Sequence, residues 1–191
     1  MAVTERWREE KQMDFIDILR EKAFLGREFL TWLWFKSEQS GGRVEIPGQK
    51  VFEVIFRDRM TLDLSDAETP QSVTIKGDHS ELREGMAALK EGKKIEEASI
   101  SIRSEENEFS LVLKATWFSF GAFRTPPVLP GEDFDADEGP EGAFLEKAYL
   151  IEEGMEIIDT LFEYFLNTRI SDEWESRELP ALRNWIESAG P

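Results

Sequence analysis

The 191-residue chain contains no cysteine and a single histidine, His79. Without cysteine it forms no disulfide, binds no metal through thiolates and uses no thiol nucleophile. One histidine also leaves only one imidazole base, which argues against a histidine-dependent catalytic triad. His79 stands beside residues that resemble a helix start, so we interpret it as a surface residue. We therefore expect no catalytic residue and no cofactor.

Long apolar runs and basic residues are also scarce. No apolar stretch is long enough to cross a bilayer, and residues 1–10 lack the apolar core of a signal peptide. This predicts a cytoplasmic protein with no membrane partner. Lysine and arginine number 23 against 40 aspartates and glutamates, which gives a net charge of −17. Because a duplex-DNA binder displaces counterions with cations, a DNA-binding function requires that the basic residues be segregated on one face.

The N-terminal part of the chain is rich in apolar residues at helical spacing. Residues 4–23 are typical of a half-exposed helix with Thr4 as its N-cap, and residues 24–37 are apolar nearly all round, which predicts a buried helix. Two interpretations of the aromatic residues in the second segment stay open. They belong to the core, or they form an interface with a second chain, since aromatic side chains are common interface anchors. The candidate interface residues are Trp32, Trp34 and Phe35.

The middle of the chain shows the alternation of apolar and polar residues that a half-buried sheet requires, as in Phe52, Val54 and Phe56. Asp78 and Glu81 resemble a capping box at a helix start, and Gly92 suits the cap at the end of that helix. In chain order the predicted elements are strand residues 43–64, a strand at 73–75, a helix at 80–91, and strands at 95–103 and 109–118 joined by a hairpin loop.

The C-terminal third predicts a loop and a long helix. Residues 124–142 combine proline, glycine and acidic residues, which is typical of an exposed loop. Over residues 143–167 apolar residues form two stripes along one helix. The first stripe consists of Phe144, Ala148, Ile151, Met155, Ile158, Phe162 and Phe165, and the second of Leu150, Ile157, Leu161 and Tyr164. So broad an apolar surface predicts a helix that packs on the sheet and leaves room for a partner.

Together these patterns predict an α+β fold, in which an antiparallel sheet is packed by a long C-terminal helix and preceded by an N-terminal helical segment. The predicted segments are an N-terminal helical segment at 1–40, an α+β core at 41–170 and a short helix with Trp174 and Trp185 at 171–191.

A calcium loop is the metal site that the sequence suggests first, through Asp133, Asp135 and Asp137. An EF-hand loop starting at Asp133 needs glycine at its sixth position and glutamate at its twelfth. The chain has Glu138 and Phe144 there. The pattern fails, so we interpret these acids as a solvated loop and expect no metal.

The basic residues are distributed unevenly. Residues 76–94 contain five lysines and arginines among four acids, whereas residues 132–159 contain eleven acids and a single base, Lys147. This distribution suits either a basic face or ordinary solvated lysines, and charge alone does not choose between them.

The order of these features resembles the C-terminal region of the recombination-associated RdgC family, over residues 27–168. Trp34-Phe35-Lys36-Ser37 resembles a motif in that family's preceding helix, and Ile75-Lys76, the capped helix and the turn Glu91-Gly92-Lys93 resemble its strand, acidic helix and basic turn. The acidic linker and the helix at 149–166 resemble its closing segment.

The resemblance implies a function. Members of that family form a ring-shaped dimer that encloses duplex DNA without sequence preference and modulates recombination. It implies phosphate contacts by Lys93 and Lys76, and we add their neighbours Lys90 and Lys94 as candidate DNA-binding residues. The family's N-terminal region has no counterpart before Met1, so we expect a homodimer or a companion chain that supplies it.

We therefore expect a non-enzymatic protein of DNA recombination that binds double-stranded DNA. The alternative is an acidic protein–protein interaction module that keeps the fold and does not bind DNA.

Overall fold

The structure is a computed structural model that describes residues 25–48, 50–64, 72–76, 82–105, 107–116, 118–128 and 139–188. Residues 25–39 are helical, and we call them the aromatic helix. The remaining elements are β1 (Arg43–Glu45), β2 (Val51–Asp63), β3 (Ser72–Lys76), α2 (Leu82–Lys90), β4 (Lys94–Arg103), β5 (Glu108–Lys114), β6 (Ser119–Arg124), α3 (Gly139–Arg169), a π-helical turn (Trp174–Glu178) and α4 (Leu179–Ser188). The predicted α+β class is confirmed.

Some predictions concern parts of the chain outside the described residues. These are the helix at 4–23, the capping pair Asp78 and Glu81, the surface position of His79, and the acidic loop that holds Asp133, Asp135 and Asp137.

The described strands form one antiparallel sheet in the order β1-β2-β4-β5-β6, and β3 also pairs with β2. The long strand β2 carries two short neighbours on one edge: β1 pairs with its residues 51–53 and β3 with its residues 59–63. The opposite edge of β2 pairs with β4. β2 therefore lies between β4 and the two short strands of this edge.

One face of this sheet is buried and the other is open, as the alternation predicts. The buried apolar side chains come from every second residue of the three central strands, except where the register of β4 against β2 shifts between Ile95 and Glu97. They are Phe52, Val54, Phe56, Met60 and Leu62 of β2, Ile95, Ala98, Ile100 and Ile102 of β4, and Phe109, Leu111 and Leu113 of β5.

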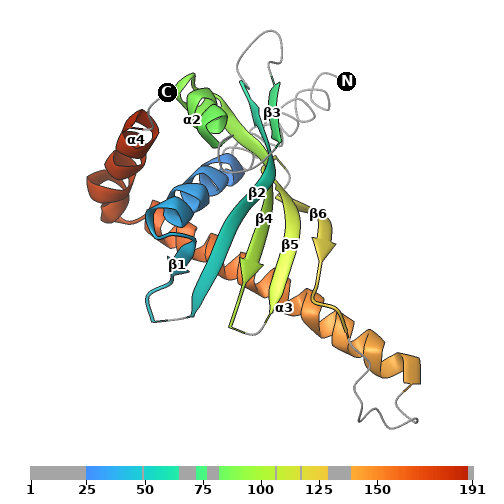
Figure 1. Cartoon of the computed structure of the whole chain (residues 1–191). Coiled ribbons are helices and arrows are strands. Elements are labelled where there is room, and N and C mark those ends of the chain that lie inside the picture. Colours follow the sequence, from blue (N-terminus) through green and yellow to red (C-terminus); the bar gives the residue numbers. More distant parts are fainter. Residues whose placement is uncertain are drawn as a thin grey trace, which may run out of the picture.

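The helices lie on the buried face, where α3 crosses behind the strands (Figure 1). At Gly26 of the aromatic helix a Cβ atom would collide with the carbonyl oxygen of Ala115, in the turn after β5. Glycine is therefore required at that position for the helix and this turn to touch.

Two groups of aromatic rings join the aromatic helix, one to α3 and the other to α4. The ring centroid of Phe29 lies 5.2 Å from that of Phe162, and those of Trp34 and Trp185 lie 5.2 Å apart at 90°. Edge-to-face rings at this distance are attractive. The described residues of the three predicted segments thus pack around one core.

Two predicted boundaries are wrong. The strand predicted at 109–118 ends at Lys114, because the chain turns there, with Phe118 at a φ of 45°, and continues as β6, which the sequence did not predict. The loop predicted at 124–142 ends earlier, since α3 begins at Gly139. Pro140 suits the first turn of a helix, where its missing N–H is not needed.

Candidate functional site

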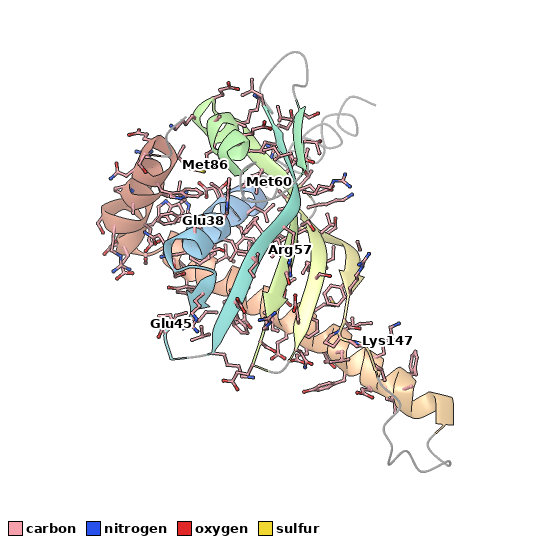
Figure 2. The ribbon with its side chains drawn as sticks, in the orientation of Figure 1. Glu38, Glu45, Arg57, Met60, Met86 and Lys147 are labelled. Carbon is pink, nitrogen blue, oxygen red and sulfur yellow. The ribbon has the colours of Figure 1, made fainter. Side chains whose placement is uncertain are left out.

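The open face of the sheet carries alternating basic and acidic side chains. Arg103 donates to Glu53 at 3.1 Å and to Glu108 at 2.9 Å, and Arg57 also donates to Glu108 at 2.9 Å. A second group joins Glu97 to Arg59 at 3.4 Å and to Lys114 at 3.7 Å. Figure 2 shows Arg57 in the middle of this face. Carboxylates therefore neutralise the cations of the open face.

Glu108 is the central carboxylate of this network. Hydrogen bonds from Arg103 and Ser101 hold the pKa of Glu108 below its usual value, and the bond to Glu108 raises the pKa of Arg103. The side chains of Arg103 and Glu108 are about half exposed, so water screens the interaction between them. The paired and screened cations of this network therefore contribute little to binding an anion that approaches from solution.

Three of the predicted DNA-binding lysines lie at one turn between α2 and β4. The N–H of Lys93 donates to Ala88 and that of Gly92 to Leu89, both at 3.0 Å, with Gly92 at a φ of 85°. These two bonds form a Schellman motif, which confirms Gly92 as the helix cap. The turn brings Lys90, Lys93 and Lys94 together.

The environment of these lysines is mixed in charge. The side chain of Lys93 is only 11% exposed, and its ammonium lies 2.5 Å from the carboxylate of Glu91. Lys94 lies opposite Asp63 in the register of β4 against β2. Lys76 lies on β3, at the opposite edge of β2, and its side chain is outside the described part of the structure. The structure therefore brings three of the four predicted lysines together, with acids among them.

The predicted partner interface requires a correction. Trp32, Trp34 and Phe35 are 0–1% exposed and lie in the core of the chain itself. Trp32 packs on Tyr164 and Phe165 of α3, and Phe35 packs on Trp185 of α4. Of the two interpretations of the aromatic residues, the structure has the core helix, because α3 and α4 cover the aromatic helix.

The motif Trp34-Phe35-Lys36-Ser37 has a structural role. Lys36 Nζ lies 2.9 Å and 2.7 Å from the two carboxylate oxygens of Glu178, whose side chain is 6% exposed. The hydroxyl of Ser37 donates to the carbonyl of Val54 at 2.6 Å. These bonds fix the end of the aromatic helix to the π-helical turn and to β2.

The N-terminal half of α3 extends past the last strand of the sheet (Figure 1). Every residue from 143 to 149 is exposed, and we call residues 143–155, which also include the turns of α3 that meet the edge of the sheet, the α3 overhang. Phe144 is 71%, Leu145 66% and Tyr149 64% exposed. With Ile151 and Met155 they account for five of the seven exposed large apolar side chains of the described chain, and we call these five the apolar patch.

The two predicted stripes of this helix thus have different environments. Leu150, Ile157 and Leu161 of the second stripe are buried under the sheet. The first stripe is buried at Ile158 and Phe165, but its upstream members Phe144, Ile151 and Met155 are exposed. The helix is longer than the sheet that covers it.

A groove of about 600 Å³ lies between β6 and the α3 overhang. Its lining residues are Phe120, Phe123, Arg124, Thr125, Lys147, Ile151 and Met155. The two charged residues in this lining, Arg124 and Lys147, are both cations. A second groove, lined by Lys50, Glu153 and Glu156 among others, runs along another part of α3 and is mixed in charge.

The sequence did not predict this site. The isolation of Lys147 among acids was visible in the sequence, but its position opposite Arg124 depends on the tertiary structure. β6, which contributes Arg124, was not predicted either.

The described residues contain no group of three or more histidine, aspartate or glutamate side chains arranged to hold a metal ion. Among the same residues, no helix combines the length and apolarity that a bilayer span requires. In comparisons with known proteins, no family model, curated protein or solved structure matches the chain.

Proposed function

We propose that the chain is a non-enzymatic, cytoplasmic protein–protein interaction module, and that the apolar patch of the α3 overhang is its docking surface. The observation that carries this proposal is the exposure of Phe144, Leu145 and Tyr149 on one end of a helix that continues beyond the sheet (Figure 1). Several large apolar side chains left exposed on one part of the surface are typical of interaction surfaces.

A partner that covers the apolar patch gains free energy by removing apolar side chains from water. Burial of one large apolar side chain contributes about 1.5–3 kcal/mol, and aromatic residues are frequent hot spots. Phe144 and Tyr149 are more than half exposed in the chain alone, so most of this gain is still available to a partner.

Duplex-DNA binding, which the RdgC resemblance implies, is the competing proposal. The cluster of Lys90, Lys93 and Lys94 at one turn is the observation in its favour. The ion pair of Lys93 with Glu91, the paired cations of the open face and the net charge of −17 weigh against it. Non-specific DNA binding needs cations that are free to replace counterions.

Site-specific photo-crosslinking tests the proposal. A photoreactive phenylalanine analogue replaces Tyr149 in one variant and Asp159, an exposed residue of α3 outside the apolar patch, in the control. In cells that naturally contain the protein, we expect discrete crosslinked products from position 149 and few from position 159. Phe144→Ser should reduce the products from position 149. Equal crosslinking at both positions would contradict the proposal.

A titration with labelled duplex DNA at low salt tests the competitor. We expect no saturable binding by the wild-type chain. Binding that weakens with added salt and with the Lys93→Gln and Lys94→Gln changes would support the DNA proposal instead.

A further inference from the structure

We infer that the groove between β6 and the α3 overhang binds an acidic segment of a partner protein, with an apolar anchor in the groove and carboxylates on Arg124 and Lys147. This inference rests on the proposed function and names the chemistry of the partner. Its basis is the combination of apolar walls and two cations at one place on an acidic protein.

The walls of the groove come from two elements that are far apart in the sequence. Phe120 and Phe123 of β6 form one wall, and Ile151 and Met155 of α3 the other. Ile151 is 38% and Met155 43% exposed, so the groove is open to solvent along α3. An apolar side chain inserted here contacts aromatic rings on one side and flexible aliphatic chains on the other, a combination that adapts to different anchors.

The two cations differ from most others in the described chain. Arg57, Arg59 and Arg103 on the open face are paired with carboxylates, as are the cations at positions 27, 36, 93, 114, 169 and 177. Within the described residues no carboxylate lies within ion-pair distance of Arg124 or Lys147, and both are exposed. The charged side chains in the described lining of the groove are therefore cations, on a protein of net charge −17, and their electrostatic complement is an anion.

The apolar walls determine the class of that anion. A nucleic-acid phosphate would neutralise Arg124 and Lys147 but would leave Ile151, Met155 and the neighbouring Phe144 exposed to water. A segment with both carboxylates and a large apolar side chain covers both kinds of surface. A basic amphipathic segment would cover the apolar walls but would place its cations beside those of the groove, which is unfavourable.

The shape of β6 also limits how the segment binds. Ala122 adopts a φ of 48°, and the register of β6 against β5 shifts near it. Such a bulge disrupts the row of backbone groups that an added strand would need. We therefore attribute recognition to side chains in the groove and not to extension of the sheet.

The test measures fluorescence polarisation of labelled synthetic peptides added to the full chain. The probe alternates leucine and phenylalanine with aspartate and glutamate. One control peptide replaces the acids by lysine, and a second replaces the apolar residues by serine. We expect saturable, salt-sensitive binding of the probe and much weaker binding of both controls.

Charge reversal locates the site. Arg124→Glu combined with Lys147→Glu should weaken binding of the acidic probe by roughly tenfold or more, and should make the lysine peptide the preferred ligand. Lys50→Glu, in the lining of the second groove, is the matched control and should leave the affinity unchanged. All three positions are exposed, and circular dichroism verifies that the variants fold.

Other results would overturn the inference. These are a wild-type preference for the lysine peptide, binding that the double reversal leaves unchanged, and displacement of the probe by duplex DNA. Concentration-dependent dimerisation that displaces the probe would assign the groove to a second copy of the chain. If no peptide binds while position 149 still forms crosslinks, this inference fails and the proposed function stands. If the crosslinks are also absent, both fail.

Discussion

Gly154 of α3 lies directly against Phe109 of β5. A Cβ atom at position 154 would be 2.8 Å from Phe109 Cδ1 and 2.6 Å from the Cζ atom of Phe123. These distances are well below ordinary van der Waals contact, so the helix crosses the sheet here only because residue 154 has no side chain. This crossing fixes where α3 leaves the sheet, and hence how far the helix upstream of Gly154 extends past it.

Substitution of Gly154 tests the crossing. Overpacking of a core contact costs about 1–3 kcal/mol, whereas alanine improves helix propensity by at most about 1 kcal/mol. We expect Gly154→Ala to lower the free energy of unfolding by about 1 kcal/mol or more in urea denaturation. Adding Phe123→Leu, which replaces one of the two rings by a shorter side chain, should recover part of the lost stability. An alanine variant as stable as the wild type would show that the helix is free to shift.

The buried ion pair between Lys36 and Glu178 predicts a strong asymmetry between single and double variants. Lys36→Met leaves the buried carboxylate of Glu178 with Arg177 as its cation, whose Nε lies 3.5 Å away, so the change should cost up to about 3 kcal/mol. The double variant Lys36→Met/Glu178→Leu removes both charges and should recover most of that stability. As a control, Glu173→Ala breaks the exposed pair with Arg177 and should cost less than about 1 kcal/mol. A double variant no more stable than Lys36→Met would contradict this account.

The contact between Trp34 and Trp185 holds α4 against the aromatic helix. Removal of a large aromatic side chain from a partly buried site should cost about 3 kcal/mol, so we expect Trp185→Ala to destabilise the chain by this amount. In hydrogen exchange, residues 179–188 should lose protection before the sheet does. Asn184→Ala, an exposed change on the same helix, should leave the exchange pattern unchanged. Simultaneous loss of protection in the sheet and α4 would argue that α4 has no separate opening step.

The network around Glu108 predicts a pH dependence on the acid side. Because the bonds from Arg103 and Ser101 lower the pKa of Glu108 in the folded chain, the network stabilises the fold above the ordinary glutamate pKa of 4.5. This contribution is lost as the pH falls through the lower, folded-state pKa. Arg103→Gln should therefore be less stable than the wild type at neutral pH, and the difference should shrink in acid.

Carbon-13 NMR titration of the Glu108 carboxyl group gives a direct readout. Its pKa should lie below the ordinary glutamate value in the wild type and should rise in Arg103→Gln. The same pKa in both proteins would show that Arg103 does not control the carboxylate.

The features that the sequence predicted are those with a local physical cause. The alternation at Phe52, Val54 and Phe56 indicated a strand because successive side chains point to opposite faces. Gly92 indicated a helix end because a left-handed cap favours glycine. In contrast, β6 contains Ala122 at a positive φ, a conformation that an alanine in the sequence does not indicate.

The features that the sequence did not predict depend on contacts between distant residues. The apolar character of Trp32 is the same in a core and in an interface, and only the position of α3 decides between them. The periodicity of α3 showed two apolar stripes but not where the sheet above them ends. The groove cations Arg124 and Lys147 come from elements that meet only in the folded chain.

The contact between Lys36 and Glu178 also has a consequence for synthesis on the ribosome. These residues are 142 positions apart, and the surfaces that cover the aromatic helix come from α3 and α4. A nascent chain therefore exposes Phe29, Trp32 and Trp34 until α3 and α4 have also been translated. Such a segment is a natural binding site for chaperones, so the yield of folded protein should depend on them.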